Sequence, residues 1–303
     1  MALISHDHLQ AASLHVSSFF KGSAKTITIN GQNWKYLDQG DPESETILFL
    51  HGMGSNKSIW RGQMQGYSND KYRRIAIDIP GACLSQYFNH GKHTLTELAR
   101  WLDKYLELLN LDKIHIVAHS TMTLAGTFYA STRPEKVKTL TMMAVPNLFG
   151  DAALGPYGTI NEFRKDIEFA SPEDVAVFFD KMFYSPPKLP KTLLKLMLAE
   201  YKRYLPDFMN VIEQYAESLP IIMSHTRRVS CPTLIVNSAH DAYAPMEFTQ
   251  SLSWHYPKAQ VITLEKCGHA IMLEKPKEIR YRHNEFLQNG RVSDNKCYGT
   301  LLG

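Results

Sequence analysis

Residues 114–123 read Ile114-His115-Ile116-Val117-Ala118-His119-Ser120-Thr121-Met122-Thr123, and the expected architecture is built around them. This stretch opens with a short β-branched apolar run, which indicates a buried strand, and a helix-like sequence continues from Thr121 to about Ser131. A serine on a tight turn between strand and helix is lifted out of the sheet. The first helical N–H groups then point toward the atom that the serine oxygen attacks. The stretch is therefore typical of a nucleophile elbow, in which Ser120 would be the nucleophile.

The turn departs from the G-x-S-x-G pattern of a nucleophile elbow at both glycines. Ala118 replaces the first, and Met122 replaces the second. The change at Met122 is the larger one, because the position two after the serine normally lets the helix approach the strand closely. By itself the stretch fits an inert buried serine equally well, so the remaining chain must decide.

The overall composition is that of an ordinary globular enzyme, with 303 residues, 44% hydrophobic and 21% charged. A formal net charge of +3, spread over scattered basic residues, gives no reason to expect nucleic acid. Cys83, Cys231, Cys267 and Cys297 form no C-x-x-C pair, which favours free thiols in a reducing compartment. No apolar run reaches about 18 residues and no signal pattern opens the chain. We therefore expect no stable membrane insertion and a cytoplasmic location.

Short apolar runs alternate with helical segments, which predicts an α/β fold with a mostly parallel sheet and helices on both faces. An Asn30-Gly31 turn predicts a hairpin before this pattern begins. Thr94 followed by Glu97 predicts a capped helix over residues 93–110. The expected strands are 26–29, 34–37, 46–50, 74–78, 114–118, 137–143, 233–237 and 260–264.

The alternation stops after Pro146 and resumes at Thr233, and the segment between is rich in Phe, Tyr, Met and Leu. Its pattern predicts helices near 159–169, 172–183, 191–204 and 207–219, the last two separated by a break at Pro206. We therefore expect a helical cap inserted into the sheet domain. The predicted organisation is a first core part at 1–146, the cap at 147–226, a second core part at 227–290 and a loosely ordered tail at 291–303.

Four stretches with reactive side chains follow the carboxyl ends of predicted strands, where ligands bind in open α/β sheets. They are 51–54 and the segments around Ser120, Asp241 and His269. A serine hydroxyl needs a base to accept its proton, and that base needs a carboxylate to hold its tautomer. The chain order Ser120, Asp241, His269 matches the Ser…Asp…His order of known triads. We predict that these three residues are catalytic.

The backbone N–H groups of Met53 and Thr121 are expected to form the oxyanion hole of this site. Gly52, Met122 and Phe149 are expected to contact the substrate. No second ligand stands at helical spacing from His240, which lies beside Asp241, so we expect no metal.

On these motifs, the chain resembles α/β-hydrolases of the capped esterase and monoacylglycerol-lipase-like group. The similarity runs from about Trp34 to Leu287. The matching pieces are Phe49-Leu50-His51-Gly52-Met53-Gly54, Asp78-Ile79-Pro80-Gly81, Ala118-His119-Ser120, Pro134-Glu135-Lys136-Val137, Asp241 with Pro245, and Gly268-His269-Ala270 with Glu274 and Pro276. The resemblance implies a Ser-His-Asp hydrolase with a helical cap, no cofactor, and a small-molecule ester with an apolar acyl chain as substrate.

The sequence differs from that group close to the predicted site. Ala118, Met122 and Thr123 stand where the group has glycines in G-H-S-x-G-G, and Cys83 replaces the second glycine of D-x-P-G-x-G-x-S. Such changes would reshape the acyl pocket or tilt the elbow. Natural drift, deliberate redesign and loss of activity are three possible origins of the changes.

Several alternatives stay open from the sequence. Asp78 competes with Asp241 for the role of triad acid, and His51 is expected to support the oxyanion loop without reacting. Other chemistry on the same fold, namely C–C bond hydrolysis, a lyase reaction or acyl transfer, is a second candidate. A catalytically silent protein that binds a hydrophobic ligand under the cap is a third, favoured by Met122 and Thr123.

Overall fold

The structure is a computed structural model, and it describes residues 24–81, 93–147 and 160–293. Several sequence predictions lie outside these ranges: the N-terminal arm, the roles of Cys83 and Phe149, the thiol of Cys297, and most of the tail.

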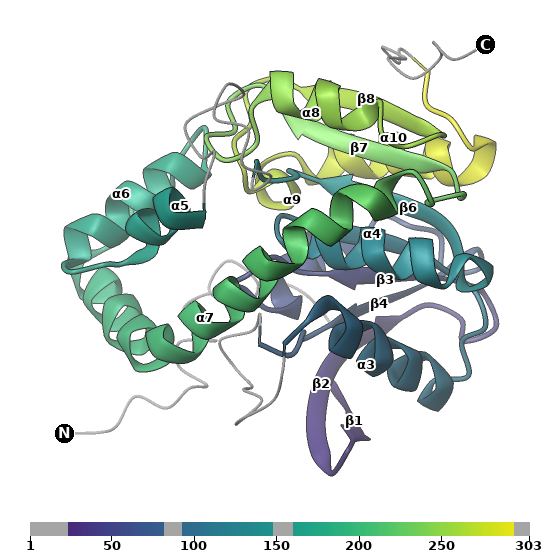
Figure 1. Ribbon diagram of the computed structural model, residues 1–303, viewed down its shortest axis with the longest axis horizontal. Helices are drawn as coiled ribbons and strands as arrows, with labels where there is room; N and C mark the ends of the chain where they lie inside the picture. The colour runs from purple at the N-terminus through teal and green to yellow at the C-terminus, as the bar shows by residue number, and fades with distance from the viewer. Residues whose placement is uncertain (1–23, 82–92, 148–159, 294–303) are drawn as a thin grey trace.

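An eight-stranded sheet forms the centre of the molecule, in the order β1-β2-β4-β3-β5-β6-β7-β8 (Figure 1). The first two strands and the β2–β4 pair are antiparallel, and every further neighbouring pair is parallel. All eight predicted strands are therefore confirmed, within two residues at most ends. The strands are β1 (Lys25–Ile29), β2 (Gln32–Gln39), β3 (Glu45–Leu50), β4 (Tyr72–Ile77), β5 (Ile114–His119), β6 (Val137–Met143), β7 (Thr233–Ser238) and β8 (Ala259–Leu264).

The predicted hairpin turn joins β1 to β2. Asn30 and Gly31 have φ angles of 51° and 76°, as a two-residue turn between right-twisted strands requires. At the other end of the fold, Gly290 ends the last helix with φ 68°. At these positions the backbone needs a positive φ angle, which asparagine and glycine adopt more readily than other residues.

Helices cover both faces of the sheet, because successive side chains of each strand point to opposite sides. Leu48 and Leu50 pack into one apolar cluster, and Ile47 and Phe49 pack into the other. The first cluster includes residues of α3 (Leu95–Leu108), α4 (Met122–Thr132) and α8 (Met246–Ser253). The second includes residues of η1 (Lys57–Trp60), α2 (Arg61–Met64), α9 (Ile271–Glu274) and α10 (Pro276–Asn289). A short turn, η2 (Pro134–Lys136), leads into β6.

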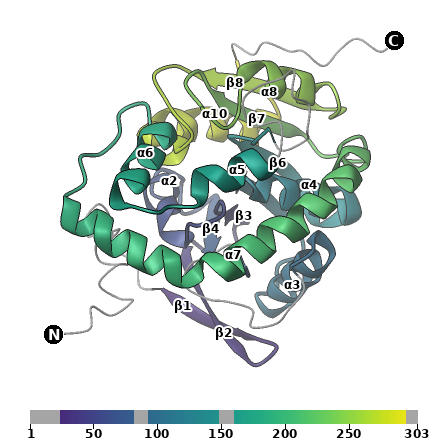
Figure 2. The same ribbon diagram turned by 60° about the vertical axis from the view of Figure 1, so that its left-hand side comes forward.

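Three helices between β6 and β7 extend away from the sheet and cross over its strand ends (Figure 2). They are α5 (Ile160–Ile167), α6 (Pro172–Met182) and α7 (Lys191–Thr226). The start of α6 is fixed by a capping box between Ser171 and Asp174. We call the described residues 160–226, which contain these three helices and the segments between them, the cap.

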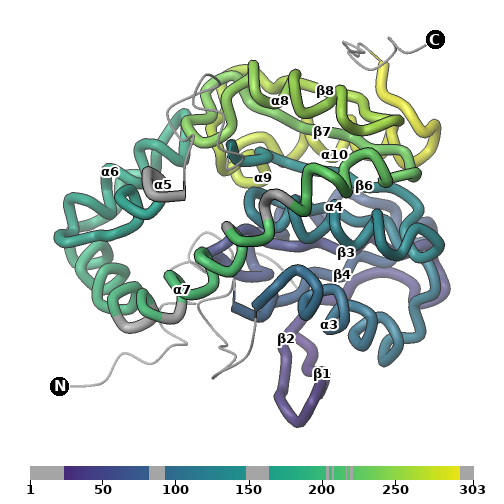
Figure 3. Tube along the Cα trace, viewed as in Figure 1, coloured from purple at the N-terminus to yellow at the C-terminus, as the bar shows by residue number. Residues whose placement is uncertain are grey.

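The predicted break at Pro206 is wrong, because α7 runs through it as one helix of 36 residues. A proline inside a helix removes one hydrogen bond and bends the axis without having to end the helix. The traces show α7 bent in this way, with its second half lying beside α4 (Figures 1 and 3). Ile222 and Tyr215 join the sheet core there, so packing outweighs the local cost of the proline.

No helix within the described ranges combines the length and the apolar content that crossing a membrane would need.

Candidate active site

Ser120 lies on the sharp turn between β5 and α4. Its φ of 53° is in the left-handed region, which a non-glycine residue enters only at a cost in strain. The turn is held by a hydrogen bond from the Ser120 N–H to the Met143 carbonyl, 2.9 Å long, and by the Thr123 hydroxyl, which donates to the Ser120 carbonyl at 2.6 Å. The elbow forms without either usual glycine.

The structure brings Ser120, His269 and Asp241 into one hydrogen-bonded line. Ser120 Oγ lies 2.9 Å from His269 Nε2, and His269 Nδ1 lies 2.9 Å from each carboxylate oxygen of Asp241. His269 and Asp241 are buried, and Ser120 is partly exposed. The imidazole is thus oriented by a carboxylate on one side and faces a hydroxyl on the other, which is the arrangement that proton transfer from a serine requires.

Asp241 is fixed in place by the turn that follows it. Its Oδ1 accepts hydrogen bonds from the N–H groups of Tyr243, at 2.8 Å, and Ala244, at 3.0 Å. The competing carboxylate, Asp78, is engaged elsewhere: it accepts from the Lys57 N–H at 2.8 Å and from Lys57 Nζ at 2.6 Å. Only Asp241 of these two carboxylates hydrogen-bonds the imidazole of His269.

His51 connects the loops that follow β3 and β4. The Ile79 N–H donates to His51 Nε2 at 3.1 Å, so the ring donates from Nδ1 to the Gly52 carbonyl at 2.8 Å. Burial lowers the pKa of His51, which keeps the ring neutral. These contacts fit the supporting role expected for His51.

His119 packs behind the reacting groups. Its Nε2 donates to the His269 carbonyl at 2.9 Å, and burial lowers the pKa of His119 to about 3. Gly52 lies against this residue: a Cβ atom on Gly52 would come within 2.9 Å of His119 Nδ1 and 3.0 Å of Ser120 Cβ. Gly52 therefore lets the loop after β3 approach the elbow, and it also lines the pocket.

One of the two expected oxyanion donors already has a hydrogen-bond partner, which is the side chain of the other residue. The Met53 N–H donates to the Thr121 side-chain oxygen at 3.1 Å. Within the described part of the chain, no hydrogen bond is made by the Thr121 N–H, and none is donated by the Thr121 hydroxyl. The sequence missed this contact because it joins side chain to backbone across 68 positions.

The prediction that Met122 contacts substrate requires correction. Met122 is fully buried in the core and lies below α7, where the Tyr215 hydroxyl is 4.0 Å from its sulfur atom. It is not among the residues that line the pocket beside Ser120. The close approach of helix and strand occurs one turn later, at Gly126, where a Cβ atom would come within 3.1 Å of Leu140.

A cavity of about 410 Å³ opens beside Ser120 and extends under the cap. Its wall is mainly aromatic and aliphatic. Among the described residues that line it there is no lysine or arginine, and Glu200 on α7 is the one acidic residue. The apolar and aromatic lining residues are Met53, Ile59, Pro146, Ile167, Phe169, Val175, Phe178, Phe179, Met182, Phe183, Met197, Tyr201, Phe208, Tyr243, Ala270, Met272 and Leu273.

Glu274 links the cap to the loop of His269. One carboxylate oxygen accepts from the Gly268 N–H at 2.7 Å and the Tyr184 N–H at 3.2 Å, and the other accepts from the Ser185 N–H at 3.0 Å. Gly268 has no room for a side chain, since a Cβ atom would come within 2.8 Å of the Phe183–Tyr184 backbone. The sequence had marked Glu274 as part of a motif without a role. We call this contact the Glu274 clamp.

Comparison with known proteins agrees with this architecture. The family described as alpha/beta hydrolase fold matches residues 45–276, well over half of the chain. The chain therefore belongs to the alpha/beta hydrolase family.

Its relatives carry out more than one hydrolytic reaction. It is 24% identical over 260 residues to 2-hydroxy-6-oxononadienedioate/2-hydroxy-6-oxononatrienedioate hydrolase of Paraburkholderia phymatum, covering 83% of this chain and 90% of that one. It is 21% identical over 285 residues to monoacylglycerol lipase ABHD6 of Mus musculus, covering 86% and 81%. Among solved structures, naproxen esterase of Bacillus subtilis superposes with a TM-score of 0.69 at 16% identity, covering 94% and 100%. Identities this low establish the fold and leave the substrate open.

Proposed function

We propose that the protein is a serine hydrolase that cleaves carboxylic esters with an apolar acyl chain. The observation that supports this most directly is the hydrogen-bonded line from Asp241 through His269 to Ser120, which ends at an apolar cavity of about 410 Å³. An apolar cavity with a few polar groups at one end suits an acyl chain whose carbonyl lies at the polar end.

In the proposed mechanism, Ser120 attacks the ester carbonyl while His269 Nε2 accepts its proton. Asp241 holds the Nδ1–H tautomer and stabilises the imidazolium that forms. His269 then gives the proton to the leaving alcohol, and the acyl group stays on Ser120. A water molecule, deprotonated by His269, attacks the acyl-enzyme, releases the acid and restores the serine hydroxyl.

The oxyanion that forms in each step needs hydrogen-bond donors. We expect one from the Thr121 N–H. The second is the Thr121 hydroxyl, which accepts from Met53 N–H and can donate its own proton to the oxyanion. A donor that itself accepts a hydrogen bond is polarised by it, so the Met53 N–H acts through the hydroxyl.

Hydrolysis of a C–C bond is the second candidate that the sequence leaves open, and the Paraburkholderia phymatum relative, named as a 2-hydroxy-6-oxononadienedioate hydrolase, supplies the substrate to compare. The substrate of that relative is a dioate, which carries two carboxylates. Binding a dianion favours arginine or lysine in the site. The described lining of this cavity offers no such side chain and includes the carboxylate of Glu200. The charge of the cavity therefore favours a substrate that is not an anion.

The test compares the purified protein with Ser120→Ala on p-nitrophenyl esters of increasing acyl length and on a 2-hydroxy-6-oxo-dienedioate. We expect a burst of nitrophenol, turnover of the esters, little turnover of the dioate, and a loss of at least about 10⁴-fold in the variant. Labelling of Ser120 by a fluorophosphonate counts the active sites. Equal ester turnover by Ser120→Ala would reject the mechanism, and faster turnover of the dioate would favour the second candidate.

A further inference from the structure

Glu200 is an acidic side chain in an apolar wall. It is partly buried on α7 and lines the cavity that contains Ser120. Among the side chains that the structure describes, which do not include those of Arg203 and Tyr204, no group donates a hydrogen bond to its carboxylate or forms an ion pair with it. A carboxylate that is partly removed from water without a partner costs free energy, and a ligand that supplies a partner recovers that cost.

Three aromatic rings, those of Phe169, Tyr201 and Phe208, line the same cavity as Glu200. The ring centroid of Tyr201, the residue next to Glu200, lies 4.6 Å from that of Phe169 and 5.9 Å from that of Phe208. All three rings line the cavity. Ring faces attract cations electrostatically, and an alkylammonium group can lie against them without losing the contact of its methyl groups.

The aromatic wall continues from the cap to the reacting groups. Phe169 is 5.3 Å from Phe178, Phe178 is 6.1 Å from Tyr243, and Tyr243 is 5.2 Å from the imidazole of His269, each measured between ring centroids. One substrate can therefore lie along the wall with its ester at Ser120 and its far end near Tyr201.

We propose that the preferred substrate is an ester that carries an alkylammonium group at the end remote from the ester bond, bound between Glu200 and the cap aromatics. This rests on the proposed ester hydrolysis and narrows its substrate class. The same charge excludes esters with a remote carboxylate. A hydroxyl group on the substrate would suit this site less well than an ammonium group. It could donate a hydrogen bond to Glu200, but it carries no positive charge for the ring faces to attract.

Matched ester pairs test the proposal. The acyl-side pair is the p-nitrophenyl esters of 4-(trimethylammonio)butyrate and 5,5-dimethylhexanoate, which have the same shape and differ in charge. The alcohol-side pair is butyrylthiocholine and S-(3,3-dimethylbutyl) thiobutyrate. In at least one pair we expect kcat/KM to be about tenfold higher for the cation, falling as salt is added. Ratios near one in both pairs would overturn the proposal.

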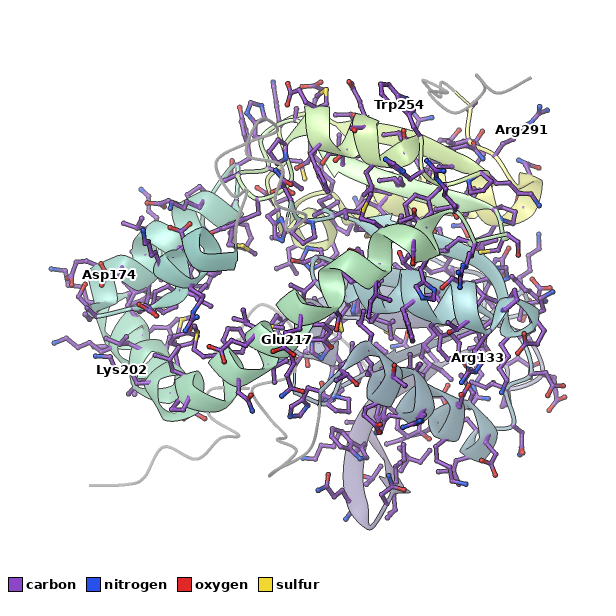
Figure 4. The ribbon with its side chains drawn as sticks, in the orientation of Figure 1. Arg133, Asp174, Lys202, Glu217, Trp254 and Arg291 are labelled. Carbon is purple, nitrogen blue, oxygen red and sulfur yellow. The ribbon has the colours of Figure 1, made fainter. Side chains whose placement is uncertain are left out.

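A variant and a control assign the preference to Glu200. Glu200→Gln keeps the size and removes the charge, and the cation-to-neutral ratio is expected to fall to about one to three. Glu217→Gln removes an exposed carboxylate from the same helix (labelled in Figure 4) that is not among the residues lining the cavity, and it should keep the wild-type ratio. Because the ratio is taken within each protein, partial loss of folded enzyme does not change it. An unchanged cation-to-neutral ratio in Glu200→Gln would show that the Glu200 carboxylate does not bind the cation.

A binding measurement separates this proposal from the proposed reaction. Tetrapropylammonium chloride should raise the Tm of the wild type relative to equal sodium chloride, and should raise that of Glu200→Gln much less. If no ester is hydrolysed but this shift appears, the ester reaction fails and the cation site stands. If esters are hydrolysed without charge preference or shift, the cation site fails and the reaction stands.

Discussion

Replacing Thr121 by valine tests the oxyanion arrangement more sharply than any other single change. Valine keeps the branched shape and removes the hydroxyl, so the site loses the O–H donor. The valine methyl also occupies the position of the oxygen, which lies 3.1 Å from the Met53 nitrogen. It therefore stands between the freed N–H and the oxyanion.

The size of the effect follows from the hydrogen bonds that a valine side chain cannot make. One donor to an oxyanion is worth about 2.7–4 kcal/mol of transition-state stabilisation, so kcat should fall by about 10²–10³-fold. KM should change little, because the ester carbonyl carries no charge before attack. The Met53 N–H is also left without its partner inside the protein, which should lower the free energy of unfolding by about 1–3 kcal/mol.

The assay is steady-state hydrolysis of a p-nitrophenyl ester, with active sites counted by fluorophosphonate labelling and stability measured by urea unfolding. Thr121→Ser is the matched control, because it keeps the hydroxyl and loses one methyl group. It should retain most of the activity.

Two results would refute the reasoning. A kcat for Thr121→Val within about twofold of wild type would mean that the hydroxyl does not donate to the oxyanion. A higher kcat would mean that the valine methyl does not keep the Met53 N–H from the oxyanion and that this N–H stabilises the oxyanion better than the hydroxyl does.

Three further predictions concern the surroundings of the site and the stability of the fold. Asp241→Asn should lower kcat by about 10⁴-fold, since an amide favours the wrong tautomer of His269, and a loss under tenfold would contradict the triad. Gly52→Ala should lower kcat/KM by about 10²-fold, because its new Cβ would come within 3.0 Å of Ser120 Cβ and shift the elbow, and unchanged kinetics would show that the loop can yield. Burial lowers the pKa of His283 to about 3, below the ordinary value near 6.5, so the unfolded chain binds one more proton between these values and stability falls as pH drops below 6.5. Urea unfolding at pH 7.5 and 5.5 should show a loss about 1.4 kcal/mol smaller in His283→Gln than in wild type, and equal losses would argue that the imidazole protonates in the fold.

The sheet was predictable because its signal is local. Strands such as Thr46–Leu50 are continuous runs of buried residues. The turn residues Asn30 and Gly31 are the residue types that adopt positive φ angles most readily. The helix α8 was missed because its short sequence, Met246–Ser253, has no strong start signal and packs through only a few residues. At Pro206 a local rule gave the wrong answer, because burial of the second half of α7 against α4 decides the outcome.

The chemistry of the candidate site was predictable from residue type and chain order, whereas its fine geometry was not. Ser120, Asp241 and His269 follow separate strands, and parallel strands end at one edge of the sheet. The contact between Met53 and Thr121 depends on which rotamer one hydroxyl adopts, and no spacing rule encodes that. Glu200 gave no signal either, because its place in an apolar wall appears only when the cap is folded over the sheet.

The Glu274 clamp constrains how this enzyme can be re-engineered. The carboxylate binds the backbone at Gly268 and at Tyr184 and Ser185, and the Ala270 N–H donates to the Met182 carbonyl at 3.0 Å. The end of α6 and the residues after it are thus hydrogen-bonded to the loop that contains His269. A cap from another protein, grafted onto this sheet, must supply backbone groups that make the same hydrogen bonds to Glu274 and to the Ala270 N–H. Without them, the imidazole of His269 will lose its alignment, even if the new acyl pocket is well designed.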